Sequence, residues 1–155
     1  MNAFNKTIEL AEKECQEKGE RLTKKRKTIL LALLQSQKAI SAYELVDYCK
    51  KHFSETIPVM SIYRILDFLQ SQGLAHRLDL ANKYVACSHI ACGHKHKLSQ
   101  FLICDQCQRV EEIDIDQSTL QKLQSGINKT GFHLINPQLE INGICNKCFS
   151  EKHLP

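Results

Sequence analysis

The sequence lacks any apolar stretch long enough to cross a membrane, since nowhere do 18 apolar residues run together. Its first 20 residues carry charges throughout and hold no continuous apolar segment, so a secretory signal peptide is not expected. Extreme composition is also absent: 43% of the residues are hydrophobic and 25% are charged, which excludes wholesale disorder. These absences predict a soluble, folded protein of the cytoplasm, with one sizeable core or two small ones.

Eight cysteines are present, and in a reducing cytoplasm they are poor candidates for disulfides. Four of them form two C-x-x-C pairs. A redox pair needs an exposed thiol at a helix N-terminus, whereas a strand is expected soon after Cys104. Two pairs can instead surround one Zn²⁺ tetrahedrally and leave no position open for a substrate. The sequence therefore predicts a structural zinc bound by Cys104, Cys107, Cys145 and Cys148. Cys15 and Cys49 lie on helix faces and are expected in the core.

Positive charge is concentrated early in the chain, although the net charge is only +4. Residues 21–27, RLTKKRK, hold five cations, whereas residues 110–116, VEEIDID, are acidic. This asymmetry favours a polyanionic partner for the first half. The plain alternative for so short a run is a solvated helix start.

Four helical segments and a hairpin are expected in the first half. Thr23 can cap the second helix, and Ser41 with Glu44 forms a capping box for the third. The fourth is predicted to begin at Ser61 as its N-cap and to stop at Gly73. Two short extended runs then flank an Ala-Asn turn, as in a β-hairpin.

This order is typical of a winged helix-turn-helix, whose last helix enters a DNA major groove. The first helix is then an additional arm, and an ordinary packing helix is the plain alternative for the fourth. Within that fourth helix Arg64 lies about 200° from Ile62, which heads the apolar stripe, so its side chain is expected to point outward. Arginine can bind guanine in a bidentate way, while other cations of the basic run hold phosphates. The predicted DNA-binding residues are Tyr43, Ser61, Tyr63, Arg64, Arg21, Lys24, Lys25 and Arg26.

The second half has a different character. Residues 87–97, CSHIACGHKHK, show no helical or strand period and indicate a metal-binding linker. Two strands, a helix over 116–130, a strand over 132–143 and the last C-x-x-C follow. We therefore predict an α+β protein with a winged helix-turn-helix domain over 1–86 and an αβ domain over 98–155. The second domain is small for independent stability, which favours dimerisation through it.

Metal-type side chains straddle the boundary between these domains: His76, Cys87, His89, Cys92, His94, His96 and Glu112. A mixed nitrogen, sulfur and oxygen set suits Zn²⁺, and a thiolate argues against iron(II) or manganese. A zinc hydrolase or deaminase would need an open metal position beside a general base, and no H-x-E precedes a P-C-x-x-C here. An enzyme with a small-molecule substrate is therefore not expected.

Several segments resemble the ferric uptake regulator family, most closely its zinc uptake regulator branch, over nearly the whole chain: RLTKKR, ISAYELVDYC, SIYRILDFLQSQGLAHRL, NKYVAC, FLICDQCQRVEEI and INGICNKC. The resemblance implies a dimeric, metal-responsive transcriptional repressor. It also implies a structural zinc on the four paired cysteines and DNA contacts centred on Tyr43 and Arg64, with Tyr63 beside them. The implied regulatory zinc ligands are His76, Cys87, His96 and Glu112, with His94 as the alternative to His96.

The implied function is repression of zinc-uptake genes when a zinc-loaded dimer binds palindromic operator DNA. A sensor of iron or peroxide is the alternative within the same fold, and Cys87 disfavours it. Gln108 stands where a glycine commonly follows the second cysteine of the family. Asn136 and Pro137 occupy the place of a ligand histidine found in many members, for which His133 is a partial substitute.

Overall fold

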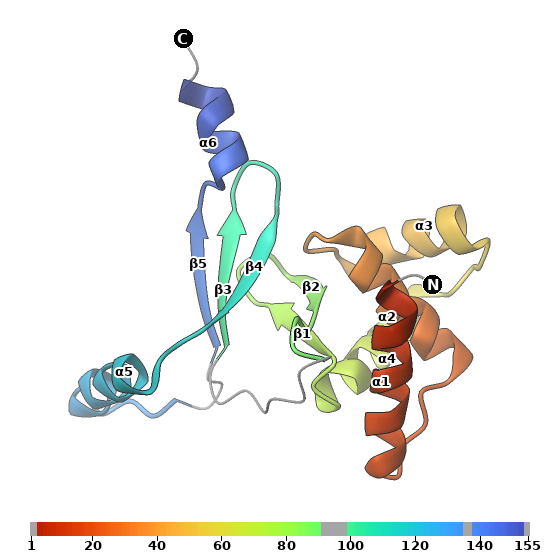
Figure 1. The fold of residues 1–155 in the computed structure, drawn as a ribbon, viewed down its shortest axis with the longest axis horizontal. Helices are drawn as coiled ribbons and strands as arrows, with labels where there is room; N and C mark the ends of the chain where they lie inside the picture. The colour runs from red at the N-terminus through yellow and green to blue at the C-terminus, as the bar shows by residue number, and fades with distance from the viewer. Residues whose placement is uncertain (1–2, 91–98, 135–137, 154–155) are drawn as a thin grey trace. The chain divides into compact units, whose positions relative to one another are not determined.

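The chain folds into two compact units, residues 1–94 and 95–155, drawn as a ribbon in Figure 1. This computed structural model describes residues 3–90, 99–134 and 138–153. Within those ranges no helix is both long and apolar enough to cross a membrane. The first unit is mostly helical, and the second is built on a sheet.

The first unit contains α1 (Ala3–Glu17), α2 (Lys24–Ser36), α3 (Ala42–Phe53), α4 (Val59–Ser71), β1 (Ala75–Leu78) and β2 (Lys83–Ala86). Two helix starts follow the predicted caps. The Thr23 hydroxyl accepts a hydrogen bond of 3.4 Å from the Arg26 N–H, and the Ser41 hydroxyl accepts one of 3.1 Å from the Glu44 N–H. Each cap satisfies a backbone donor that the helix itself leaves unpaired.

α4 begins earlier than the sequence predicts, which corrects the assignment of Ser61 as its N-cap. The N-cap is Pro58, with φ −60° and ψ 144°, and no side chain caps the helix. Proline suits a helix start because its ring fixes φ and it lacks an N–H that would be left unpaired there. Ser61 consequently lies inside the first turn, next to the exposed Met60.

The other end of α4 is where the sequence predicts it. Gly73 has φ 72°, and its N–H donates to the Gln70 carbonyl at 3.0 Å. The Leu74 N–H donates to the Leu69 carbonyl at 2.8 Å. These two bonds form a Schellman motif, which ends a helix at a glycine in the left-handed conformation.

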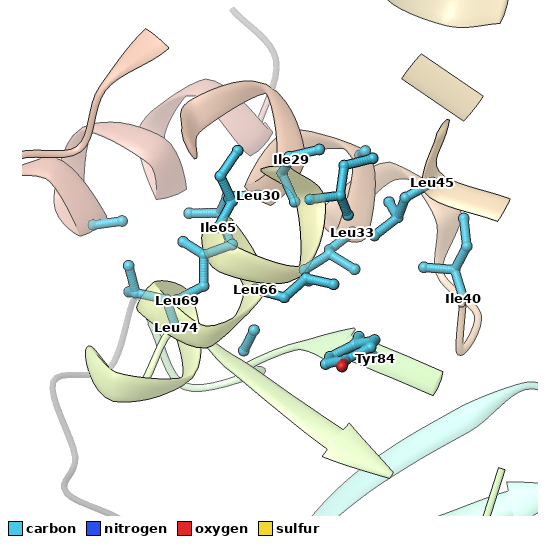
Figure 2. Packing of buried hydrophobic residues seen from close by; sticks show 14 of the residues in the cluster. Ile29, Leu30, Leu33, Ile40, Leu45, Ile65, Leu66, Leu69, Leu74 and Tyr84 are labelled. Atoms are coloured by element: carbon cyan, nitrogen blue, oxygen red, sulfur yellow. The ribbon is translucent and has the colours of Figure 1, made fainter. Parts of the chain in front are cut away.

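The core of the first unit lies where α2, α3 and α4 pack together (Figure 2). α4 contributes a stripe of buried apolar residues at helical spacing: Ile62, Ile65, Leu66 and Leu69. Burial of each such side chain stabilises the fold by about 1.5–3 kcal/mol. Cys15 and Cys49 are buried in the same cluster, which confirms them as core residues. Burial raises the pKa of the Cys49 thiol to about 11.

β1 and β2 form the predicted antiparallel hairpin, in which His76 pairs with Val85. The Cys87 N–H extends the ladder by donating to the Leu74 carbonyl at 2.9 Å. Since side chains alternate along a strand, this register places His76 and Cys87 on one face of the hairpin.

The segment before α3 ties this hairpin to the helices. Ile40 and Tyr84 exchange two backbone hydrogen bonds, of 3.0 and 2.8 Å. Tyr84 is itself buried in the core, where Figure 2 shows its ring. An ion pair of 3.2 Å between Lys83 and Glu44 adds a contact from β2 to α3. The hairpin is therefore held as a wing against the helical core.

The second unit contains β3 (Ser99–Cys104), β4 (Val110–Asp114), α5 (Gln117–Lys129), β5 (Gln138–Gly143) and α6 (Asn146–His153). β3 is the central strand, with β4 antiparallel on one side and β5 parallel on the other (Figure 1). The predicted strand over 132–143 is shorter than expected, because residues 132–134 have no regular structure. α6 was not predicted. The α+β fold class, with a winged helical unit before a small αβ unit, is confirmed.

Candidate metal centre and nucleic-acid interface

Four cysteine side chains of the second unit converge on one point. Their sulfur atoms all lie within 4.8 Å of one another, and the Sγ atoms of Cys107 and Cys145 are 3.8 Å apart. A tetrahedral zinc site with bonds of roughly 2.3 Å places its sulfurs roughly 3.8 Å from one another. The four residues thus brought together are the ones predicted from the sequence: Cys104, Cys107, Cys145 and Cys148. Their number, chemistry and spacing fit Zn²⁺.

The first pair is positioned by a tight turn between β3 and β4. The Gln108 N–H donates to the Cys104 carbonyl at 2.9 Å, and the Cys104 N–H donates to the Arg109 carbonyl at 2.9 Å. Gln108 has φ 64°, in the left-handed region that strains residues with a side chain. A glycine, which is common here in the resembled family, would adopt this conformation without strain.

Hydrogen bonds within the cluster lower the pKa of one thiol and raise the pKa of another. The Cys145 N–H donates to the Cys104 sulfur at 3.3 Å. This bond and a weaker one from the Cys107 backbone favour the thiolate and lower the pKa of Cys104 to about 6. At Cys148 the side-chain hydrogen bond with Cys145, followed by burial, raises the pKa to about 12. A divalent cation that binds all four thiolates would relieve their mutual repulsion.

The second pair lies at the start of α6. The Cys145 carbonyl accepts the first helical bond, of 2.9 Å, from the Phe149 N–H, so Cys148 falls in the first turn. A helix N-terminus also suits a reactive thiol. Because the sulfurs of both pairs lie together, the geometry favours a four-thiolate metal site over a two-thiol redox couple.

The residues predicted to bind a regulatory zinc are distributed over both units. In the first unit, the ligand atoms of His76 and Cys87 lie within 4.8 Å of each other on the wing. Cys87 is buried and His76 is half-buried. In the second unit, Glu112 lies half-buried on β4. His96 and its alternative His94 lie outside the described residues.

α4 presents an exposed face opposite its apolar stripe. Met60, Arg64 and Asp67 are exposed and recur at i, i+4 and i+7 on one side of the helix. The outward position of Arg64 is therefore as predicted. Met60, 64% exposed, was missed because the predicted helix began after it, although its spacing from Arg64 was a usable signal. Tyr43, near the start of α3, is 67% exposed.

Two other residues predicted to face DNA are less accessible than expected. Tyr63 is half-buried and packs against the core cluster. At about 100° per residue it lies only about 60° around the helix from the buried Leu66, which places it at the edge of the apolar stripe. Ser61 is also half-buried.

Some cations of the basic run, residues 21–27, are exposed, whereas others contact neighbouring groups of the protein. Arg21, Lys24 and Lys25 are exposed. Lys27 forms an ion pair of 2.7 Å with Glu12 of α1. Cations near a helix N-terminus oppose the macrodipole, so the exposed lysines weaken α2 slightly, a cost that an anion bound there would offset.

Arg26 makes its contacts within the protein, which the basic run alone did not indicate. Its guanidinium carbon lies 3.5 Å from the centroid of the Phe68 ring of α4. Its Nη1 donates a hydrogen bond of 2.6 Å to the Arg21 carbonyl. The side chain is half-buried in this position.

A winged helical unit with an exposed arginine on its last helix, followed by an αβ unit with a tetracysteine cluster, defines a two-domain metalloregulator. The family model agrees with this class: the ferric uptake regulator family matches residues 17–142. The chain belongs to the ferric uptake regulator family.

Zinc uptake regulators are among its similar proteins. The zinc uptake regulation protein of Escherichia coli (strain K12) is 34% identical over 138 residues, which cover 89% of this chain and 78% of that protein. The ferric uptake regulation protein of Synechococcus elongatus is 33% identical over 137 residues, which cover 87% and 90%. The resemblance stated from the sequence motifs is confirmed.

Two solved structures extend this likeness to the fold. A zinc uptake regulator complexed with zinc and DNA has a TM-score of 0.87 at 29% identity, covering 99% of this chain and 100% of that one. The structure of holo XcZur has a TM-score of 0.79 at 33% identity, covering 94% and 99%.

Proposed function

We propose that this chain is a zinc-responsive transcriptional repressor and not an enzyme. As a zinc-loaded homodimer it binds palindromic operator DNA in the cytoplasm and represses genes of zinc uptake. The observation that carries this proposal is the likeness, over 99% of the chain, to a zinc uptake regulator complexed with zinc and DNA.

The exposed face of α4 supports the DNA-binding part of the proposal. Arg64 can donate two parallel hydrogen bonds to guanine O6 and N7 in a major groove, and Met60 on the same face can contact a thymine methyl group. Lys24 and Lys25 can hold phosphates without reading sequence. The proposed DNA contacts are Tyr43, Ser61, Tyr63, Arg64, Arg21, Lys24 and Lys25.

One face of the sheet supports the homodimer. The strand register places Leu102, Ile113 and Ile141 on this face, where they are 37%, 40% and 46% exposed. Leu102 and Ile141 also line a hollow of about 320 Å³, formed mainly by β3, β5 and the segment that leads into α6. A second copy would withdraw this apolar surface from water. A two-fold dimer also matches the symmetry of a palindromic operator.

The proposal includes one structural zinc and at least one regulatory zinc per chain. The four cysteines hold the structural ion, which ties α6 to the turn between β3 and β4. The regulatory ion takes His76, Cys87, Glu112 and His96, with His94 as the alternative. The Cys87 thiolate favours zinc over iron(II) or manganese in that set.

Regulation follows from where these ligands lie in the chain. His76 and Cys87 belong to the first unit and Glu112 to the second, so a zinc ion that binds all three couples the two units. In a dimer this coupling sets the separation of the two α4 helices, which must match operator half-sites about one helical turn, or a multiple of it, apart. By linkage, zinc and operator strengthen each other's binding.

A zinc titration that records bound zinc and DNA binding together tests this function. The probe is a fluorescent duplex selected from a randomised pool by the zinc-loaded protein. Wild-type protein is expected to gain affinity for this duplex as the second zinc per chain enters. Cys87→Ala should keep the structural zinc and lose that gain, whereas Cys15→Ala, which removes a buried thiol of α1, should behave as wild type.

Two results would contradict the proposal. In the first, one zinc per chain saturates both wild type and Cys87→Ala, and DNA binding is already maximal. In the second, iron(II) binds more tightly than zinc and drives the same gain in DNA affinity, which would transfer the function to iron sensing.

A further inference from the structure

We infer that Arg26 is a positioning residue that fixes the orientation of α4, and not a phosphate contact. The inference rests on the proposed function, because the role that it assigns to Arg26 is to present α4 correctly to DNA. It assigns Arg26 a role different from that of Lys24 and Lys25, the lysines beside it in the basic run.

The contacts of Arg26 use both the face and the edge of its guanidinium. The guanidinium carbon lies 3.5 Å from the Phe68 ring centroid, well inside the roughly 6 Å range of a cation–π interaction. At the edge, Nη1 donates to the Arg21 carbonyl at 2.6 Å. A planar, weakly hydrated arginine can make both contacts at once, which the point charge of a lysine cannot.

Phe68 is well placed to control the rotation of α4. It lies four residues after Arg64, about 40° around the helix, and it is half-buried at the border of the apolar stripe. The aliphatic side chains of the stripe are non-directional in their packing. A stacked cation at the border of the stripe adds a directional contact that resists turning of the helix about its axis. Such turning would misalign Arg64 for bidentate hydrogen bonds, which demand good geometry.

A second contact from the same region reaches the end of α4. The Lys18 ammonium donates a hydrogen bond of 3.3 Å to the carbonyl of Gln72, the C-cap residue. A cation at a helix C-terminus complements the macrodipole. Lys18 directly follows α1 and Arg26 lies in the first turn of α2, so cations at the two adjoining helix ends contact α4 at two points one turn apart, Gln72 and Phe68.

Lys24 and Lys25 differ from Arg26 in this respect. Both are exposed, and within the described residues neither side chain makes an ion pair or a hydrogen bond. They therefore serve as matched controls for a cation that contacts phosphate.

The salt dependence of DNA binding separates the two roles. The experiment uses zinc-saturated, full-length protein, the selected fluorescent duplex and an unrelated duplex of equal length. Each phosphate neutralised contributes about 0.9 to the slope of log affinity against log salt concentration. Arg26→Lys keeps the charge and is expected to lose about tenfold in affinity for the selected duplex. Its slope and its binding to the unrelated duplex should not change.

Two further variants complete the comparison. Lys25→Gln should lower the slope by about 0.9 per subunit and weaken both duplexes alike. Phe68→Leu removes the ring without changing any charge, and it should reproduce the selective loss of Arg26→Lys. Combining Arg26→Lys with Phe68→Leu should cost little more than either change alone, because both remove the same contact.

Other results would overturn the inference. If Arg26→Lys binds as wild type while Arg26→Gln lowers the slope as Lys25→Gln does, Arg26 is a phosphate contact. If Arg26→Lys and Phe68→Leu lower only the thermal midpoint and leave the preference between duplexes unchanged, the contact is merely structural. Failure of wild-type protein to prefer the selected duplex would instead overturn the proposed function.

Discussion

Cys107→Ala removes one of the four sulfurs that converge in the second unit, and it should greatly weaken zinc binding there. Structural zinc in small domains contributes on the order of 10 kcal/mol, which shared over four ligands is about 3 kcal/mol each. The loss corresponds to about a hundredfold weaker affinity for the ion. Competition with a chromophoric chelator measures this change directly.

The structural consequence should be confined to the second unit. Among the described residues of that unit, the buried apolar side chains are few: Phe101, Ile103, Cys104 and Leu120. The first unit has a large buried cluster of its own. Amide hydrogen exchange should therefore show lost protection in β3, β4, β5 and α6, and retained protection in α2 and α4.

The matched control for this prediction is Cys49→Ala, which removes a buried thiol of α3 with no assigned metal role. It should keep the zinc content and zinc affinity of wild type. The reasoning is refuted if Cys107→Ala holds its structural zinc as tightly as wild type, or if protection falls equally in both units.

Two further predictions concern the second unit. Gln108→Gly should raise the free energy of unfolding of zinc-loaded protein by about 0.5 kcal/mol, because relief of left-handed strain outweighs the added entropy of the unfolded chain. Gln106→Gly, where φ is not positive, should lower it in the same denaturant titration, and equal effects would contradict the strain. A hydrogen bond from the Thr119 side chain and the 2.7 Å bond from the Thr119 N–H to the carboxylate lower the pKa of Asp116. This cap therefore stabilises α5 above the ordinary carboxyl pKa, and the stabilisation is lost as pH falls through the lowered value. Asp116→Asn should make the thermal midpoint fall less steeply as pH drops below the ordinary carboxyl pKa, and an unchanged profile would contradict the assignment.

Local rules predicted the parts of the fold that depend on neighbouring residues. The caps at Thr23 and Ser41 and the stop at Gly73 each involve hydrogen bonds within a few positions of the chain. The β-hairpin that forms the wing was predicted from two short extended runs on either side of a turn. The cysteine pairs were equally readable, because each pair is a local motif and four thiolates suit one ion.

The elements that were missed depend on other information. The predicted start of α4 was placed at Ser61 because serine is a good N-cap, whereas Pro58 sets the start through its fixed φ. α6 has none of the apolar periodicity that identifies a packed helix, and its first residues were read only as metal ligands. The edge position of Tyr63 follows from helix geometry and from how far the core extends.

Long-range contacts account for the remaining difference. A basic run in the sequence shows how many charges are present, but it does not show which of these side chains make contacts within the protein. The ring that Arg26 covers is 42 residues away in the chain, and the partner of Lys27 lies on α1. Only the fold of the first unit shows that Arg26 and Lys27 contact the protein, while Lys24 and Lys25 remain exposed.

The reciprocal dependence of zinc and DNA binding tests the central claim most directly. The measurement is the affinity of the second zinc per chain, with and without a saturating amount of the selected duplex. The account predicts that the duplex strengthens zinc binding by the same factor as zinc strengthens duplex binding, about 5- to 150-fold in typical allosteric systems. A zinc affinity that the duplex leaves unchanged would contradict a zinc-responsive repressor.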